Sequence, residues 1–190
     1  SPYLELIDQM GEEASTRIGP AGRTPFEDAV HAFNEYFYDE QGFRGNRDRY
    51  DDPRNSFLND VLDRRVGIPI TLAIVYLCVG RRIGLPLEGI SFPGHFLVRL
   101  PVEDGIVVMD PFNQGRPVGF EELRERASAH MDGGSPTDAQ LIQTLDPASS
   151  RATLMRRFHV RLDPCSMMRT GRIKTFATDV PRTAARSRNH

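Results

Sequence analysis

Hydrophobic residues recur at helical spacing near the start of the chain. Residues 24–27 read Thr-Pro-Phe-Glu, which has the form of a capping box with proline at the first helical position. The apolar residues that then fall on one helical face are Phe26, Ala29, Val30, Phe33 and Phe37. This pattern predicts a helix that ends near Tyr38 and turns its apolar face toward a core.

A polar loop is expected over residues 42–55, and a short helix after it. Ser56 is placed to cap this helix and Gly67 to end it. The apolar residues of the helix are Phe57, Leu58, Val61 and Leu62.

Residues 68–79 are apolar on every side, which is typical of a buried central helix. Pro69 stands where a helix can start, and the Gly-Leu-Pro segment at residues 84–86 ends it. Two strands are expected next, over residues 89–100 and 106–110, joined by a turn-rich segment. Helices followed by an antiparallel hairpin indicate an α+β fold, in which the buried central helix packs on an antiparallel sheet behind N-terminal helices.

The charge of the chain is divided unevenly. Residues 1–150 carry 14 arginines against 24 acidic residues, whereas residues 151–190 carry 10 basic residues against Asp163 and Asp179. The last 40 residues show no sustained apolar period after Leu162, so they can bury little surface to offset the entropy of ordering. We therefore expect one domain over residues 1–150 and a basic, mostly disordered tail over residues 151–190. Such a tail allows weak contact with nucleic acid, and the alternative is a solvated terminus without a partner.

Several classes of protein are excluded by composition. No apolar run approaches the roughly 20 residues that span a bilayer, and the first residues lack the layout of a signal peptide, so we expect a cytoplasmic protein without a membrane partner. Two cysteines, Cys78 and Cys165, cannot form a disulfide framework. The five histidines lack zinc-ligand spacing, and neither a metal nor another cofactor is expected.

The predicted hairpin carries the most suggestive pair of side chains. If the turn is centred between Val102 and Glu103, His95 lies directly opposite Asp110, and the carboxylate can orient the imidazole. If residues 104 and 105 form a tight turn instead, Asp110 faces Arg99 and a catalytic role loses support. In a structural alternative, Asp110 caps the turn that follows it.

Five segments in order carry a resemblance to a known family. They are the segments 42–46 (GFRGN), 55–58 (NSFL), 61–72 (VLDRRVGIPITL), 92–96 (FPGHF) and 110–112 (DPF). This series resembles the transglutaminase-like superfamily, of the papain-like fold class, and within it the bacterial SirB-type branch. The resemblance covers roughly residues 2–150.

The resemblance implies a cysteine at the start of the central helix, a histidine base on the next strand and an aspartate on the strand after it. His95 and Asp110 match the second and third roles. Counting back from Gly84 and from Ala73 places the cysteine position at Pro69, which has no nucleophilic atom. The resemblance therefore implies a degenerate triad.

Other residues could replace the missing nucleophile. Thr71, in the first helical turn, is the candidate, and its alternative role is to bond backbone groups at the helix start. Cys78 lies nine residues after Pro69, which places it on the opposite side of the helix. It is expected to be a small buried hydrophobe. Asn55 is expected to brace the preceding loop through its amide. The mixed-charge segment 44–52 is expected to be solvated, with anchoring of a ligand as the alternative.

Three hypotheses for function follow. The first is a non-catalytic transglutaminase-like domain that binds a peptide or protein partner at the site of His95 and Asp110, with a regulatory role. The second is an amide or ester hydrolase or transferase that uses Thr71 or a water activated by His95. The third is a nucleic-acid-binding regulator that acts through the basic tail.

Overall fold

The structure, a computed structural model, describes residues 2–19, 25–130 and 134–147. Its longer helices are α1 (Pro2–Ile18), α2 (Phe26–Asn34), α3 (Leu58–Arg64), α4 (Pro69–Arg82), α5 (Phe120–Ser128) and α6 (Asp138–Thr144). A π-helix η1 (Glu35–Glu40) and the 3-10 helices η2 (Pro53–Ser56) and η3 (Pro111–Asn113) complete the helical elements of these residues. The strands are β1 (Arg44–Gly45), β2 (Val66–Gly67), β3 (Glu88–Phe92), β4 (His95–Val102), β5 (Gly105–Asp110) and β6 (Arg116–Pro117).

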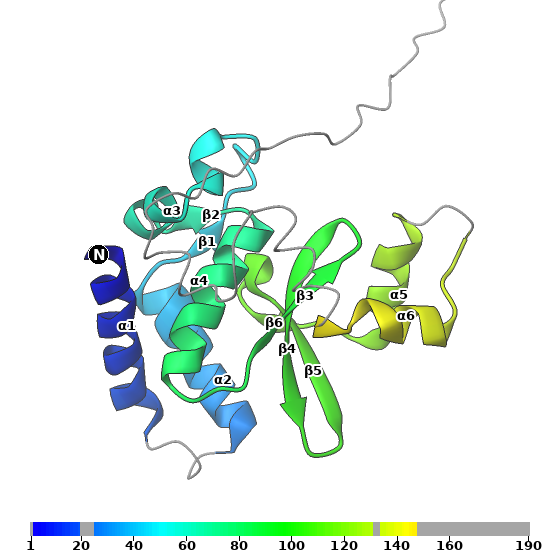
Figure 1. Cartoon of the computed structure of the whole chain (residues 1–190), viewed down its shortest axis with the longest axis horizontal. Coiled ribbons are helices and arrows are strands. Elements are labelled where there is room, and N and C mark those ends of the chain that lie inside the picture. Colours follow the sequence, from blue (N-terminus) through cyan, green and yellow to red (C-terminus); the bar gives the residue numbers. More distant parts are fainter. Residues whose placement is uncertain (1, 20–24, 131–133, 148–190) are drawn as a thin grey trace, which may run out of the picture.

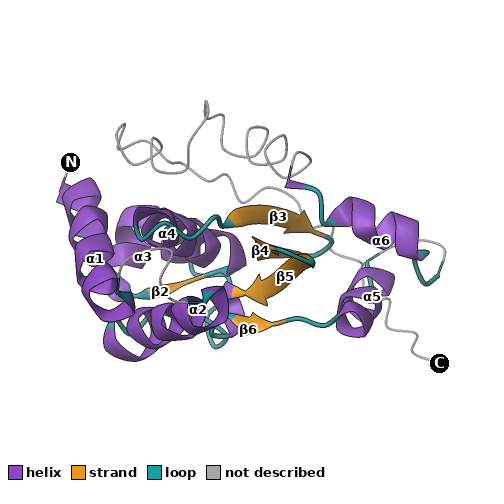
Figure 2. Ribbon diagram, turned by 90° about the horizontal axis from the view of Figure 1, so that it is seen from below, coloured by secondary structure: helices purple, strands orange, loops and turns teal. Residues whose placement is uncertain are grey.

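A four-stranded antiparallel sheet stands between two groups of helices. The strand order is β3-β4-β5-β6, while β1 and β2 pair separately and in parallel. Helices α1 to α4 lie on one side of the sheet, and α5 and α6 lie on the other (Figures 1 and 2). The α+β architecture with a buried central helix on an antiparallel sheet is thus confirmed.

Helix α4 is the centre of the larger core. Its residues from Thr71 to Gly80 are all buried, as the apolar run predicts, and Pro69 occupies its first turn. Side chains from α1, α2, η1 and α3 surround it, and β4 contributes Phe96, Val98 and Leu100 from the sheet.

The opposite face of the sheet has its own core. Leu97 of β4 and Val108 of β5 pack there with Leu123 and Ala127 of α5 and Leu141 of α6. Because side chains alternate between the faces of a strand, the odd-numbered residues of β4 point toward this second core. His95 begins β4 on that alternation, and Asp110 ends β5 on the same face as Val108.

The predicted helices exist, but their ends differ from the prediction. Helix α2 begins at Phe26 with Pro25 before it, and it continues as a π-helix instead of remaining α-helical to Tyr38. The side chain of Phe26 is 48% exposed and does not join the core. Thr24, the predicted cap, lies outside the described residues.

The short helix α3 also departs from the expected caps. Phe57 precedes it without a side-chain cap bond, and Ser56 belongs to η2. Arg65, in the left-handed conformation with φ 60°, ends the helix in place of Gly67, which lies in β2.

The predicted first strand is in fact two strands. Residues 89–100 are interrupted by a turn at Pro93 and Gly94, where Gly94 has φ +69°, so that β3 and β4 form a hairpin of their own. Glycine adopts this backbone conformation without the penalty that a side chain brings. The polar loop after Gly42 likewise contains β1, which pairs with β2.

The basic tail, the cysteine Cys165, and the histidines His159 and His190 lie outside the described residues. The boundary between residues 150 and 151 therefore remains a prediction. In the part of the chain that is described, no helix is long and apolar enough to cross a membrane.

Gly45 permits a close contact that fixes β1 against η3. A Cβ atom at Gly45 would lie 2.6 Å from the Phe112 ring and 2.8 Å from the Phe112 carbonyl oxygen. We expect Gly45→Ala to lower the free energy of unfolding by about 1–3 kcal/mol, because backbone as well as side chain must shift. Gly119→Ala is the control, since nothing lies within 4 Å of its Cβ position. Equal urea midpoints for the two variants would contradict this packing.

Candidate functional site

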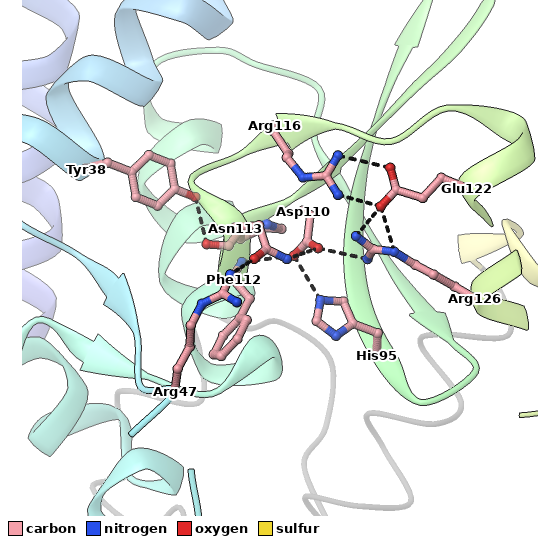
Figure 3. A network of polar contacts seen from close by, with 10 residues as sticks. Tyr38, Arg47, His95, Asp110, Phe112, Asn113, Arg116, Glu122 and Arg126 are labelled. Carbon is pink, nitrogen blue, oxygen red and sulfur yellow. Dashed lines mark hydrogen bonds and ion pairs between the residues drawn. The ribbon is translucent and has the colours of Figure 1, made fainter. Parts of the chain in front are cut away.

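His95 and Asp110 are in direct contact at one end of the sheet. Their side chains meet with 2.8 Å between Nε2 of His95 and Oδ1 of Asp110 (Figure 3). The His95 side chain is 18% exposed, whereas that of Asp110 is fully buried. The contact that the sequence predicts is therefore confirmed.

The register that brings them together is not the predicted one. Val98 pairs with Met109 and Val102 with Gly105, so the loop between β4 and β5 consists of Glu103 and Asp104. His95 and Asp110 are consequently not directly opposite, and the tight turn that would set Asp110 against Arg99 is also wrong, since Arg99 pairs with Val108. A diagonal cross-strand neighbour remains within reach of a long side chain such as histidine.

Asp110 accepts hydrogen bonds from four groups. Oδ1 receives His95 Nε2 and the Phe112 backbone N–H at 3.1 Å, so Asp110 also caps η3 as the structural alternative expects. Oδ2 receives Asn113 Nδ2 at 2.5 Å and Arg126 Nη1 at 2.9 Å. Burial favours the neutral acid, but the hydrogen bond and charge of His95, and the bonds from Arg126 and Asn113, outweigh it and hold the pKa of Asp110 well below its usual range.

Because Asp110 is ionised, it determines which nitrogen of the imidazole carries the hydrogen. A carboxylate has no proton to donate, so His95 Nε2 carries the hydrogen of the shared bond. In the neutral imidazole, Nδ1 then carries the lone pair. The site thus presents Nδ1 as the nitrogen for a ligand or a reacting atom.

Helix α5 completes the polar network. Arg126 bonds Glu122 through Nε at 3.0 Å and Nη2 at 2.6 Å, and Arg116 bonds the same Glu122 carboxylate (Figure 3). Arg126 is therefore held in place from both sides, by Glu122 and by Asp110. Sequence reasoning did not find Arg126 or Asn113, because a single arginine in an amphipathic helix carries no signal of the carboxylate it will meet.

Aromatic and basic groups surround the imidazole on its other side. The Phe112 ring lies edge-on to His95, with centroids 6.0 Å apart, and edge-on to Tyr50 at 6.1 Å. The Arg47 guanidinium lies over Phe112 at 5.6 Å and bonds Asn113 Oδ1. Two distant segments, the loop after β1 and helix η3, therefore meet beside His95.

Asn55 braces this loop, as the sequence predicts. It is fully buried, and its Nδ2 donates to the carbonyl groups of Arg49 at 2.7 Å and Tyr50 at 3.0 Å. Its Oδ1 accepts from Asn46 Nδ2 at 3.0 Å. These bonds help to hold the backbone at Arg49 and Tyr50 in place.

The first turn of α4 offers no activated hydroxyl. Thr71 is 1% exposed, and its hydroxyl donates to the Asn55 carbonyl at 2.8 Å while accepting from the Ile68 N–H at 3.1 Å. This is the structural role that the sequence left open as an alternative. Pro69 is buried at the helix start, and Cys78 is fully buried further along.

The other histidines and possible ligands of a metal form no second centre. His31 lies near Glu35 on α2 with a highly exposed side chain, and His130 bonds the Arg126 carbonyl through Nδ1 and packs over Gly94. No group of three or more histidine, cysteine, aspartate or glutamate side chains in the described residues could hold a metal ion.

The fold and the oriented His-Asp pair on neighbouring strands define a transglutaminase-like domain. A sequence profile of the transglutaminase-like superfamily matches residues 1–159, and the chain belongs to this superfamily. The chain is similar to a UPF0162 protein of Xylella fastidiosa, with 58% identity over 154 residues, which are 81% of this chain and 54% of that protein. It is also 39% identical over 116 residues to a UPF0162 protein of Vibrio cholerae, covering 60% of this chain and 43% of the relative.

A eukaryotic protein shares part of the same region. F-box only protein 21 of Mus musculus is 37% identical over 111 residues, which are 54% of this chain and 18% of that protein. No solved structure matches the chain. The chain spans about half the length of the first bacterial relatives, so its resemblance to them concerns this domain.

Replacing Asp110 tests the buried carboxylate. We expect Asp110→Asn to lower the free energy of unfolding by about 3 kcal/mol at pH 7, because Arg126 and His95 lose their charged acceptor. The folded pKa of Asp110 lies below the ordinary value near 4, so its contribution is complete above that pH and is lost as the pH falls further. Denaturant unfolding from pH 7 to pH 3 should show the two proteins converging.

Asp104→Asn is the matched control, since Asp104 is exposed in the loop between β4 and β5. It should change stability by less than about 0.5 kcal/mol at either pH. A difference between wild type and Asp110→Asn that stays constant down to pH 3 would show that the Asp110 charge does not stabilise the fold.

Proposed function

We propose that this chain is a non-catalytic transglutaminase-like domain, of the SirB type, that binds a peptide or protein at the face around His95. The observation that carries the proposal is the state of the α4 N-terminus. Pro69 stands at the position where the resemblance implies a cysteine, and the one hydroxyl of the first turn, that of Thr71, gives its proton to a backbone carbonyl. In this proposal the domain retains His95 as an oriented base and has no nucleophile at residue 69.

The geometry of the His95 and Asp110 network supports a binding role better than a role in stability alone. A buried carboxylate with four donors costs desolvation, and a hydrophobic replacement of comparable size often serves stability equally well. The network nevertheless holds His95 where its side chain is 18% exposed, with Phe112 beside it. A fixed imidazole, a neighbouring aromatic ring and a neighbouring guanidinium are the groups that bind peptide backbone and side chains well.

A second candidate, an amide or ester hydrolase, draws on the same pair. Thr71 is poorly suited to it because its hydroxyl is buried and engaged. A water activated by Nδ1 of His95 is the remaining form of this hypothesis, since Asp110 orients the imidazole as a base requires. The third candidate, nucleic-acid binding by residues 151–190, concerns a segment outside the described residues.

Restoring a thiol tests whether the site is a catalytic scaffold without its nucleophile. In a Cys165→Ser background, Pro69→Cys should give a thiol whose pKa lies well below the free value of about 8.5, because the helix N-terminus and His95 stabilise the thiolate. Burial of this position acts in the opposite direction, so a lowered value reports those two groups. The ultraviolet absorbance of the thiolate, followed against pH, measures it without requiring a reagent to enter.

The contribution of His95 is isolated by the double variant Pro69→Cys with His95→Ala, whose thiol pKa should return toward the free value. Loss of the proline itself should cost only about 1 kcal/mol. If the single variant folds and its thiol titrates near 8.5, His95 is not directed at residue 69 and the degenerate-triad assignment is wrong.

Binding is tested with peptides selected from a random-peptide phage library against the folded wild-type chain. Selected synthetic peptides should lose at least about tenfold in affinity for His95→Ala and bind His31→Ala unchanged, because His31 is an exposed histidine on the far helix α2. Fluorescence anisotropy gives the affinities, and circular dichroism checks that each variant is folded. Peptides that bind His95→Ala as well as wild type would contradict a partner site at His95. Turnover of chromogenic esters that His95→Ala abolishes would favour the hydrolase.

A further inference from the structure

Three arginines near the start of the loop that meets the His95 site have no carboxylate partner in the described residues. Eight arginines elsewhere form ion pairs with carboxylates, namely Arg17, Arg54, Arg64, Arg82, Arg99, Arg116, Arg124 and Arg126. Arg44, Arg47 and Arg49 are exposed, and no carboxylate of the described residues pairs with them. Arg65 and Arg81 also lack a carboxylate partner, but Arg65 lies over the Phe43 ring and Arg81 donates to the Leu87 carbonyl. Three of the five arginines without such a partner in the described residues therefore lie in one six-residue stretch.

Arg47 is the member of this group that the structure places at the site. Its guanidinium donates to Asn113 Oδ1 and lies over the Phe112 ring. Asn113 in turn donates to Asp110, so Arg47 is two hydrogen bonds from the carboxylate that orients His95. A guanidinium has five N–H donors, and a carboxylate can take two of them in parallel.

Tyr50 provides an apolar surface next to this charge. Its side chain is 50% exposed although its ring contacts Phe112, which is itself half-buried. The loop that presents Tyr50 is fixed by Asn55, which binds the carbonyl groups of residues 49 and 50. A half-exposed aromatic ring on a fixed backbone loses little conformational entropy when a partner covers it.

We infer that the partner is a peptide segment in which an aromatic or large aliphatic side chain packs on Tyr50 and Phe112 while a nearby carboxylate pairs with Arg47. The inference rests on the proposed function and names the chemistry of its ligand. It also gives the mixed-charge segment 44–52 the ligand-anchoring role that the sequence left as an alternative.

The neighbouring acids limit what this surface attracts. Asp48 and Asp51 are exposed in the same loop and offset the long-range field of its arginines, and Asp52 is engaged by Arg54 and Arg64. Recognition therefore depends on one close contact with Arg47 rather than on a broad positive potential. A single carboxylate beside an apolar group suits such a surface better than a polyanion does.

A double-mutant cycle tests the carboxylate contact. Each selected peptide is synthesised in two forms. One has the selected sequence, and in the other the acidic residue is replaced by its amide, Glu by Gln or Asp by Asn. For the wild-type chain, the amide peptide should bind about tenfold more weakly, whereas for Arg47→Ala the two peptides should bind equally. Arg44→Ala, which removes an exposed arginine of the same stretch, should keep the tenfold difference.

The apolar contact with Tyr50 is tested by a variant and a matched control. Tyr50→Ala should weaken the acidic peptide by about tenfold, and Ile142→Ala should not, since Ile142 is 61% exposed but lies on α6. Tyr50→Phe should retain binding if ring packing is the interaction, and it guards against a general effect of Tyr50→Ala on the loop.

The outcomes separate this inference from the proposed function. If selected peptides need His95 but the acid and amide forms bind wild type equally, the carboxylate assignment is wrong and the binding site stands. If single-stranded DNA displaces the peptides and its binding depends on Arg47, a phosphate ligand replaces the peptide carboxylate. If no selected peptide depends on His95, both the proposed site and this inference fail.

Discussion

The ionised carboxylate of Asp110 is the group around which the site is organised. A buried charge is costly unless it is paired and hydrogen-bonded, and Asp110 meets that requirement by drawing donors from three separate elements. His95 comes from β4, Asn113 from η3, and Arg126 from α5. The ends of two strands and a helix on the far side of the sheet are therefore positioned relative to one another by one side chain (Figure 3).

The π-helix η1 and the last residue of α2 add further hydrogen bonds to the same region. Tyr38 donates to the Pro111 carbonyl at 3.0 Å, and Asn34 donates to the Gly115 carbonyl at 3.3 Å while accepting from Tyr76 of α4. The central helix is thus linked to the turn after Asp110 through Tyr76 and Asn34, by hydrogen bonds that are partly buried. A π-helix often marks a functional region, because its wider turn redirects side chains that an α-helix would place elsewhere.

These constraints explain how the orientation of His95 is held independently of the residue at the start of α4. Asp110 accepts hydrogen bonds from His95, Asn113 and Arg126, and none of these bonds involves residue 69, so the orientation of His95 does not depend on the side chain there. The UPF0162 proteins and F-box only protein 21, to which this domain is similar, are longer chains that it matches only in part. The binding role proposed for this surface draws on the His95 imidazole together with Phe112, Tyr50 and Arg47.

Local patterns in the sequence were sufficient to predict helices at α2, α3 and the buried α4 and antiparallel strands after them, because periodicity and turn residues act over a few positions. No pattern specified α1, α5 or α6, and the contact between His95 and Asp110 was predicted through a register that the structure does not have. Local patterns were also not sufficient for the turn at Gly94, the register of β4 and β5, or the partner of the Thr71 hydroxyl. Only the tertiary structure decided these, and it alone brought Arg126 to Asp110 and Arg47 to Asn113, 66 residues apart. The reason is that register and ion pairing depend on the energy of contacts between distant segments. A local sequence pattern describes one segment and does not indicate which other segment it will contact.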